Sequence, residues 1–377
     1  MNLYKRVLWV PAMAALCLST AAFAHHGLGR FDRTKQVEFT GVITGIDFVN
    51  PHSYLHFEVA QAGGATLAMR CEMRAATLLR RSGWSAQMFV AGATATVFGF
   101  AHRDDPASCY LEDIKIGDGP DINRNDQFAI TSAVDVANRP RRRPSGEPNI
   151  SGDWAQEQYV VAVPPGGGGG ALVPKSLIPA VEAGQLALAD VPASGWSPQP
   201  VTFTARGQVE AAAFRMWSPE DNPRLRCRPT SIILDWVFDG AVNRIAQEDD
   251  RIVINYGLFS FERVIHMNLG AHPANVAPSY AGHSIGRWEG DVLVVDTVGF
   301  EPGVIVPPVR HSAELHVVER FSLNPETLTL KRDYVAEDPV YFTDQYTGSD
   351  TVLVADVPYL AHPCDELTYE FLPEKKP

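Results

Sequence analysis

The chain has 377 residues, 45% of them hydrophobic, and a formal net charge of −12 at pH 7. This length is sufficient for two domains. An acidic chain repels phosphate backbones, which argues against a nucleic acid partner. Beyond the N-terminal segment, no apolar run approaches the roughly 18 residues of a membrane span, so none is expected.

Residues 1–24 have the three parts of a secretory signal. Lys5 and Arg6 form the charged region, an apolar run follows, and Ala22-Phe23-Ala24 supplies the small-x-small cleavage pattern. We therefore expect an exported protein, periplasmic or secreted, whose mature chain begins at His25.

An exported chain would meet an oxidising compartment, where disulfides are the default state of cysteines. The four cysteines after the signal allow three pairings. One bridge in each domain is the economical choice, which pairs Cys71 with Cys109 and Cys227 with Cys364.

The first domain after the signal is expected over residues 25–128. Alternating apolar and polar residues predict strands at 36–48, 54–60, 65–73, 93–101 and 109–117, with a helix at 74–83. Three strands, a helix and two strands is the order of the small five-stranded OB barrel.

A proline- and arginine-rich segment, 129–148, is interpreted as a linker, and a second domain is expected over 149–377. From Ser231 on, strands are predicted at 231–238, 242–248, 251–257, 261–268, 283–290, 291–300, 313–321 and 327–336. This regular spacing favours an antiparallel meander, closed as a barrel or folded as a sandwich. The expected fold is mainly β, and a barrel of about eight strands can hold one small ligand.

One group of candidate residues lies near the expected mature N-terminus. Imidazole and amine nitrogens favour copper, and the candidate ligands are His25, His26, His52 and His56. The alternative is a frayed terminus, with His52 capping a turn and His56 facing water.

A second group lies between residues 283 and 321, where ionisable residues interrupt apolar strands. Such groups are costly to bury unless paired, so they indicate either salt bridges, such as Asp296 with Arg320, or a pocket for acid–base chemistry. The candidate catalytic residues are His283, Glu289, Asp296, His311, His316 and Glu319, and the candidate ligand-binding residues are Arg287, Trp288, Phe300, Arg320 and Phe321.

The alternative for this second group is a solvated strand face, on which every second residue is polar. A serine hydrolase is disfavoured, because no glycine-flanked elbow surrounds Ser284 or Ser312.

The stretches "AHHG…FD", "GVITGIDFVNPHSYLHFEV" and "GHSIGRWEGDVLVVDTVGF…HSAELHVVERF" resemble a group of uncharacterised exported bacterial proteins. These pair an N-terminal "AHHS…NPH" module with an all-β C-terminal domain. Gly27 stands where that group usually has serine, so a role for that serine would not carry over. The resemblance implies export and two modules, without an assigned activity. The C-terminal half is also similar in pattern to lipocalin-type barrels.

The leading hypothesis is that the C-terminal barrel binds a small, largely apolar molecule. The sequence leaves open whether it only binds this molecule or also promotes proton transfer on it, as a lyase, isomerase or hydrolase does. The alternative is a periplasmic copper-binding protein that uses the N-terminal histidines without turnover. A structural module of an envelope complex is a third hypothesis, with no specific sequence feature behind it.

Overall fold

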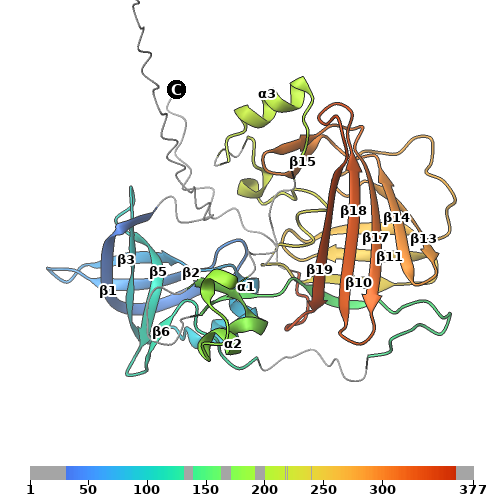
Figure 1. The fold of residues 1–377 in the computed structure, drawn as a ribbon. Coiled ribbons are helices and arrows are strands. Elements are labelled where there is room, and N and C mark those ends of the chain that lie inside the picture. Colours follow the sequence, from blue (N-terminus) through green and yellow to red (C-terminus); the bar gives the residue numbers. More distant parts are fainter. Residues whose placement is uncertain are drawn as a thin grey trace, which may run out of the picture.

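The computed structural model describes residues 31–130, 139–162, 171–191, 200–216, 218, 220–238 and 240–361. The fold is mainly β, with a small N-terminal sheet beside a nine-stranded closed barrel (Figure 1). Within these ranges, no helix is long and apolar enough to cross a membrane. The expected signal, His25 and His26 lie outside the described residues.

The N-terminal sheet has the strand order β3-β2-β1-β4-β5-β6, and a parallel pairing of β3 with β5 closes it. Helix α1 (Ala76–Arg81) lies between β3 and β4 in the chain, as in the predicted OB order. The strands are β1 (Phe31–Asp47), β2 (Tyr54–Ala60), β3 (Thr66–Glu72), β4 (Thr94–His102), β5 (Ser108–Ile116) and β6 (Asp121–Asn123).

The predicted bridge between Cys71 and Cys109 is present where β3 and β5 run side by side. Both cysteines are fully buried in the core of the sheet, among Leu55, Phe57 and Leu111. The bridge therefore fastens the pairing that closes the sheet. Cys364, the predicted partner of Cys227, lies outside the described residues.

The barrel has the strand order β10-β11-β12-β13-β14-β17-β18-β19-β7. All neighbours pair antiparallel except β12 and β13, which run parallel and share only two residue pairs. The strands are β7 (Gly152–Ala155), β10 (Asn243–Gln247), β11 (Arg251–Tyr256), β12 (Phe261–His266), β13 (His283–Glu289), β14 (Val292–Val298), β17 (His316–Asn324), β18 (Thr329–Glu337) and β19 (Tyr346–Val354).

The segment 231–238, predicted as the first strand of the meander, is instead a series of turns buried against the barrel core. The Arg332 guanidinium donates to the carbonyl oxygens of Ile232 and Ile233, both at 2.9 Å, and so holds the segment in place. A short apolar run has the same composition whether it forms a strand or a series of buried turns. The strands that complete the barrel are β7 and β19, which the sequence analysis did not predict.

Shorter elements surround these two sheets. Helices α1 and α2 lie near the junction of the sheets, and α3 lies beside β15 (Figure 1). The remaining bounds are β8 (Tyr159–Ala162), β9 (Ala171–Pro174), α2 (Ile178–Glu182), α3 (Ala205–Ala213), β15 (Gly303–Val306) and β16 (Val309–His311).

The junction between the sheets is built by α1. Asn50, fully buried, donates to Thr77 Oγ1 at 3.0 Å and accepts from the Thr77 backbone N–H at 3.2 Å, which fixes the start of the helix. At its other end, the buried Arg81 donates to Asp356 at 2.8 Å and to the carbonyl oxygen of Gln156 at 2.7 Å. Asn50 thus positions the helix that contacts the barrel side.

Candidate functional site

His52 and His56, two of the predicted metal ligands, each lie beside a different carboxylate. His52 Nδ1 is 3.0 Å from Glu72, and His56 Nε2 is 2.7 Å from Asp47. Over the described ranges, no three or more His, Cys, Asp or Glu side chains are grouped to hold a metal ion. A copper site that includes His25 and His26 stays a prediction, because those residues are outside the described part.

Glu319, a predicted catalytic residue, lies inside the barrel in a buried ionic network. It accepts hydrogen bonds from Arg263 and Arg332, the latter at 3.1 Å, and all three side chains are fully buried. Arg332 also donates to Asp350 at 2.6 Å. Burial by itself would raise the pKa of Glu319, but the two guanidinium charges and their hydrogen bonds hold that pKa below its usual value.

This network and the surrounding side chains fill the barrel interior. Arg263 also donates to Ser284 and Thr297, both buried on neighbouring strands. Phe321, a predicted ligand-wall residue, packs edge-on against Trp236 of the buried 231–238 segment, with ring centroids 5.8 Å apart. Glu319 and Phe321 therefore serve the packed core, where they have no contact with solvent.

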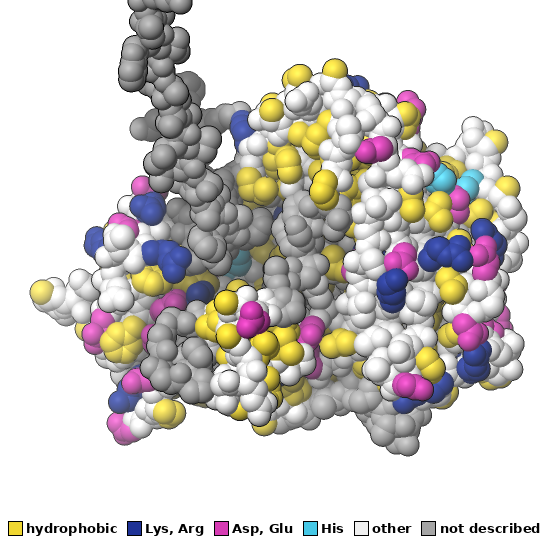
Figure 2. All heavy atoms as spheres, viewed as in Figure 1, with side chains coloured by type: hydrophobic (Ala, Val, Ile, Leu, Met, Phe, Trp, Pro, Cys, Tyr) yellow, Lys and Arg dark blue, Asp and Glu magenta, His cyan; other side chains and the backbone are white. Residues whose placement is uncertain are grey.

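Three of the predicted catalytic residues do come together, on the outer face of the barrel. His283 begins β13, Asp296 is on β14 and His316 begins β17, three neighbouring strands. The connection between β12 and β13 adds His272, and the end of β12 adds His266. We refer to these five residues as the histidine–aspartate cluster. Figure 2 shows histidine side chains at the surface on this side of the barrel.

Asp296 links two histidines of the cluster. Its Oδ1 is 2.9 Å from His272 Nε2, and its Oδ2 is 3.1 Å from His316 Nε2. Burial raises the pKa of Asp296, but the hydrogen bonds from His272 and His316 outweigh this and lower it. The predicted salt bridge between Asp296 and Arg320 does not form. Arg320 instead donates a hydrogen bond to Glu289 at 2.8 Å.

The imidazole rings extend the cluster beyond Asp296. His272 Nδ1 is 2.8 Å from His283 Nδ1, and the His266 ring stacks on the His283 ring with centroids 5.0 Å apart. Burial, and then the neighbouring His266 and His272, lower the pKa of His283. The arrangement can pass a proton between rings or present ring nitrogens to a cation. Acid–base catalysis by these residues stays a prediction.

The remaining candidates of the sequence analysis lie apart from the cluster. Glu289 pairs with Arg287 at 2.6 Å as well as with Arg320, all three at the surface. His311 is buried edge-on against Phe300, and burial lowers its pKa. Its Nδ1 is 3.0 Å from the carbonyl oxygen of Ser312, whose hydroxyl donates instead to Asp338 at 3.1 Å.

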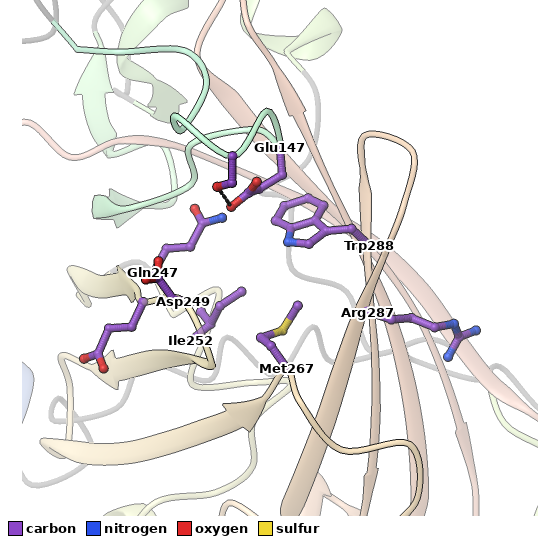
Figure 3. Close-up of a pocket in the computed structure, with 9 residues that line it drawn as sticks. Glu147, Gln247, Asp249, Ile252, Met267, Arg287 and Trp288 are labelled. Atoms are coloured by element: carbon purple, nitrogen blue, oxygen red, sulfur yellow. Dashed lines mark hydrogen bonds between the residues drawn. The ribbon is translucent and has the colours of Figure 1, made fainter.

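An open pocket of about 410 Å³ lies at one end of the barrel, and we call it the barrel-mouth pocket. Its apolar floor comes from three elements: Ile252 on β11, Met267 just after β12, and Trp288 on β13. Polar residues of two other segments form its rim, among them Ser145, Glu147, Gln247, Glu248 and Asp249. Figure 3 shows Trp288, Met267 and Ile252 facing the same space, while Arg287 points away from it.

The proline- and arginine-rich segment shapes this pocket. Arg143 donates to Asp249 at 2.6 Å and pairs with Glu147 at 3.3 Å, while Arg142 pairs with Asp291 on the β13–β14 turn. The part of the predicted linker from 139 to 148 is therefore bound to the barrel and supplies one wall.

Several residues of these sites were not among the predicted ones. Of the pocket floor, only Trp288 was predicted, because Ile252 and Met267 look like ordinary core residues in a strand pattern. His266 and His272 were also missed as site residues. A signal for His266 existed, since it alternates with the buried Arg263 and Ile265 on β12. His272 is in an irregular connection between strands, where side chains do not alternate between two faces, so the sequence pattern gives no signal.

Residues 14–109 match the model of a family of unknown function (DUF6152). This match covers the N-terminal sheet as far as the start of β5 and does not extend to the barrel. Searches among curated proteins and among solved structures found no match.

Proposed function

We propose that the protein binds a small, largely apolar molecule in the barrel-mouth pocket. The observation behind this proposal is an open cavity with an apolar floor at the end of a barrel whose interior is filled. Ligand sites are typically concave and mostly apolar, with a few polar groups that fix orientation. Here Gln247 and the rim carboxylates are the polar groups, and Trp288 offers an aromatic face.

The proposed ligand lies at the mouth of the barrel, whereas the sequence led us to expect it inside the barrel. Interior positions are occupied by Trp236, Phe321 and the ionic network of Glu319, and displacing them would expose paired charges. At the mouth, a ligand displaces only water. Its volume is bounded by the roughly 410 Å³ available, which suits a molecule of one or two rings.

The neutral fluorescent probe N-phenyl-1-naphthylamine is expected to bind in this pocket, with increased emission. Trp288→Ala removes an aromatic floor and is expected to weaken binding about tenfold, or roughly 1.4 kcal/mol. Ser145→Trp places a large ring at the rim and is expected to abolish binding. Titration by fluorescence measures both.

The matched control is Val209→Ala, which removes an exposed apolar side chain of α3 and should bind the probe as the unaltered chain does. If Trp288→Ala and Ser145→Trp also bind the probe normally, the ligand site is elsewhere.

We also infer that the protein is exported. The signal pattern of residues 1–24 supports this, and so does a disulfide in the first sheet. When the full chain is expressed in a bacterium with a periplasm, the recovered protein is expected to begin at His25. Intact mass and N-terminal peptide spectra decide this, and a cytoplasmic product that retains residues 1–24 would contradict it.

A further inference from the structure

The ring of His272 is held in one tautomer by Asp296. The two oxygens of Asp296 each face a histidine nitrogen, and an ionised carboxylate only accepts hydrogen bonds. His272 Nε2, at 2.9 Å from Oδ1, must therefore carry the proton. In the neutral ring the lone pair is then on Nδ1, the nitrogen that faces His283.

The two facing nitrogens have the spacing of neighbouring ligands on one metal ion. His272 Nδ1 and His283 Nδ1 are 2.8 Å apart. Two nitrogens at that separation, each about 2.0 Å from a metal, subtend an angle of roughly 90°. This is the angle between adjacent ligands in square-planar or tetragonal coordination, whereas a tetrahedral zinc site would need the nitrogens farther apart.

We propose that His272 and His283 chelate a divalent copper ion on the outer face of the barrel. Tetragonal geometry and imidazole donors favour Cu²⁺ among the common divalent metals. Asp296 is the positioning residue, since a carboxylate that accepts from the distal N–H of a metal-bound imidazole fixes the ring and raises its basicity. The described residues contain no group of three His, Cys, Asp or Glu side chains placed to hold a metal ion, so the proposed site has these two protein ligands.

The surroundings of the pair suit a cation. The side chains of His272 and Asp296 are partly exposed, at 18% and 30%, so an ion can reach them from solvent. The chain as a whole is acidic, with a net charge of −12. This site is separate from the barrel-mouth pocket and uses neither His25 nor His26.

The test is calorimetric titration of the full chain with Cu²⁺ alone at pH 7.5, comparing variants that share the same N-terminus. His272→Ala and His283→Ala are each expected to remove one equivalent of bound copper. Asp296→Asn is expected to weaken the same equivalent by about 10–100-fold, the usual effect of losing such a partner.

His311→Ala is the matched control. This variant also removes an imidazole from the barrel side, but His311 lies apart from the cluster, against Phe300, so the copper equivalent should remain. Circular dichroism confirms that each variant is folded. The proposal is overturned if His283→Ala binds as much copper as the unaltered chain, or if His311→Ala loses the equivalent as fully as His283→Ala does.

Discussion

Replacing Glu319 with glutamine is expected to lower the free energy of unfolding of the barrel by about 3–5 kcal/mol. Glu319 is the carboxylate between Arg263 and Arg332, all fully buried. Its removal leaves guanidinium charge without compensation in the barrel interior, and breaking a buried ion pair from one side has this cost. Urea unfolding of the variant beside the unaltered chain measures the difference.

The pH dependence of this effect has a definite sign. The folded-state pKa of Glu319 lies below its usual value of 4.5. Its contribution to stability is therefore present above that usual value and is lost as the pH falls through the folded-state pKa. The matched control is Glu289→Gln, since Glu289 makes two ion pairs at the surface, and no measurable loss is expected there. Equal losses in the two variants would contradict the buried-network interpretation.

Removing the Cys71–Cys109 bridge is expected to destabilise the N-terminal sheet by about 4 kcal/mol. The two cysteines are 38 residues apart, and closing a loop of that length restricts the unfolded chain by about this amount. The double variant Cys71→Ala/Cys109→Ala avoids effects of reductant on other cysteines. Hydrogen–deuterium exchange of the amides of β3 and β5 reports the local loss.

Cys227→Ala is the control for this experiment, because Cys227 follows a short helical turn on the barrel side and is not part of the N-terminal sheet. It should leave the exchange of β3 and β5 unchanged. Unchanged exchange in the double variant would mean that packing of the sheet, without the bridge, determines its stability.

The alternation of apolar and polar residues was sufficient to predict most of the barrel strands. On β17, Val317, Glu319 and Phe321 are the buried residues of the alternation. The pattern did not reveal what Glu319 bonds, because its partners Arg263 and Arg332 come from β12 and β18. Pairing of charges depends on which strands are neighbours, and a local period does not contain that information.

The candidate sites show the same limit. His283, Asp296 and His316 were predicted because they interrupt apolar strands, and the neighbouring order of β13, β14 and β17 brings them together. Their partner His272 belongs to a connection without periodicity. The strand predicted at 231–238 was wrong for a different reason. Its apolar run was recognised, but a strand and a buried irregular segment share that composition.

The closure of the barrel by β7 has a consequence for how the polypeptide reaches its native state. β7 pairs on one side with β10 and on the other with β19, where Ala155 is opposite Leu353. β7 comes far earlier in the chain than β19, so a chain that still lacks β19 carries two unpaired strand edges. Such contacts between distant positions form slowly, and exposed edges promote aggregation in the meantime. Closure of the barrel therefore requires the chain as far as β19, and a chain that stops before β19 is expected to be captured by chaperones or degraded.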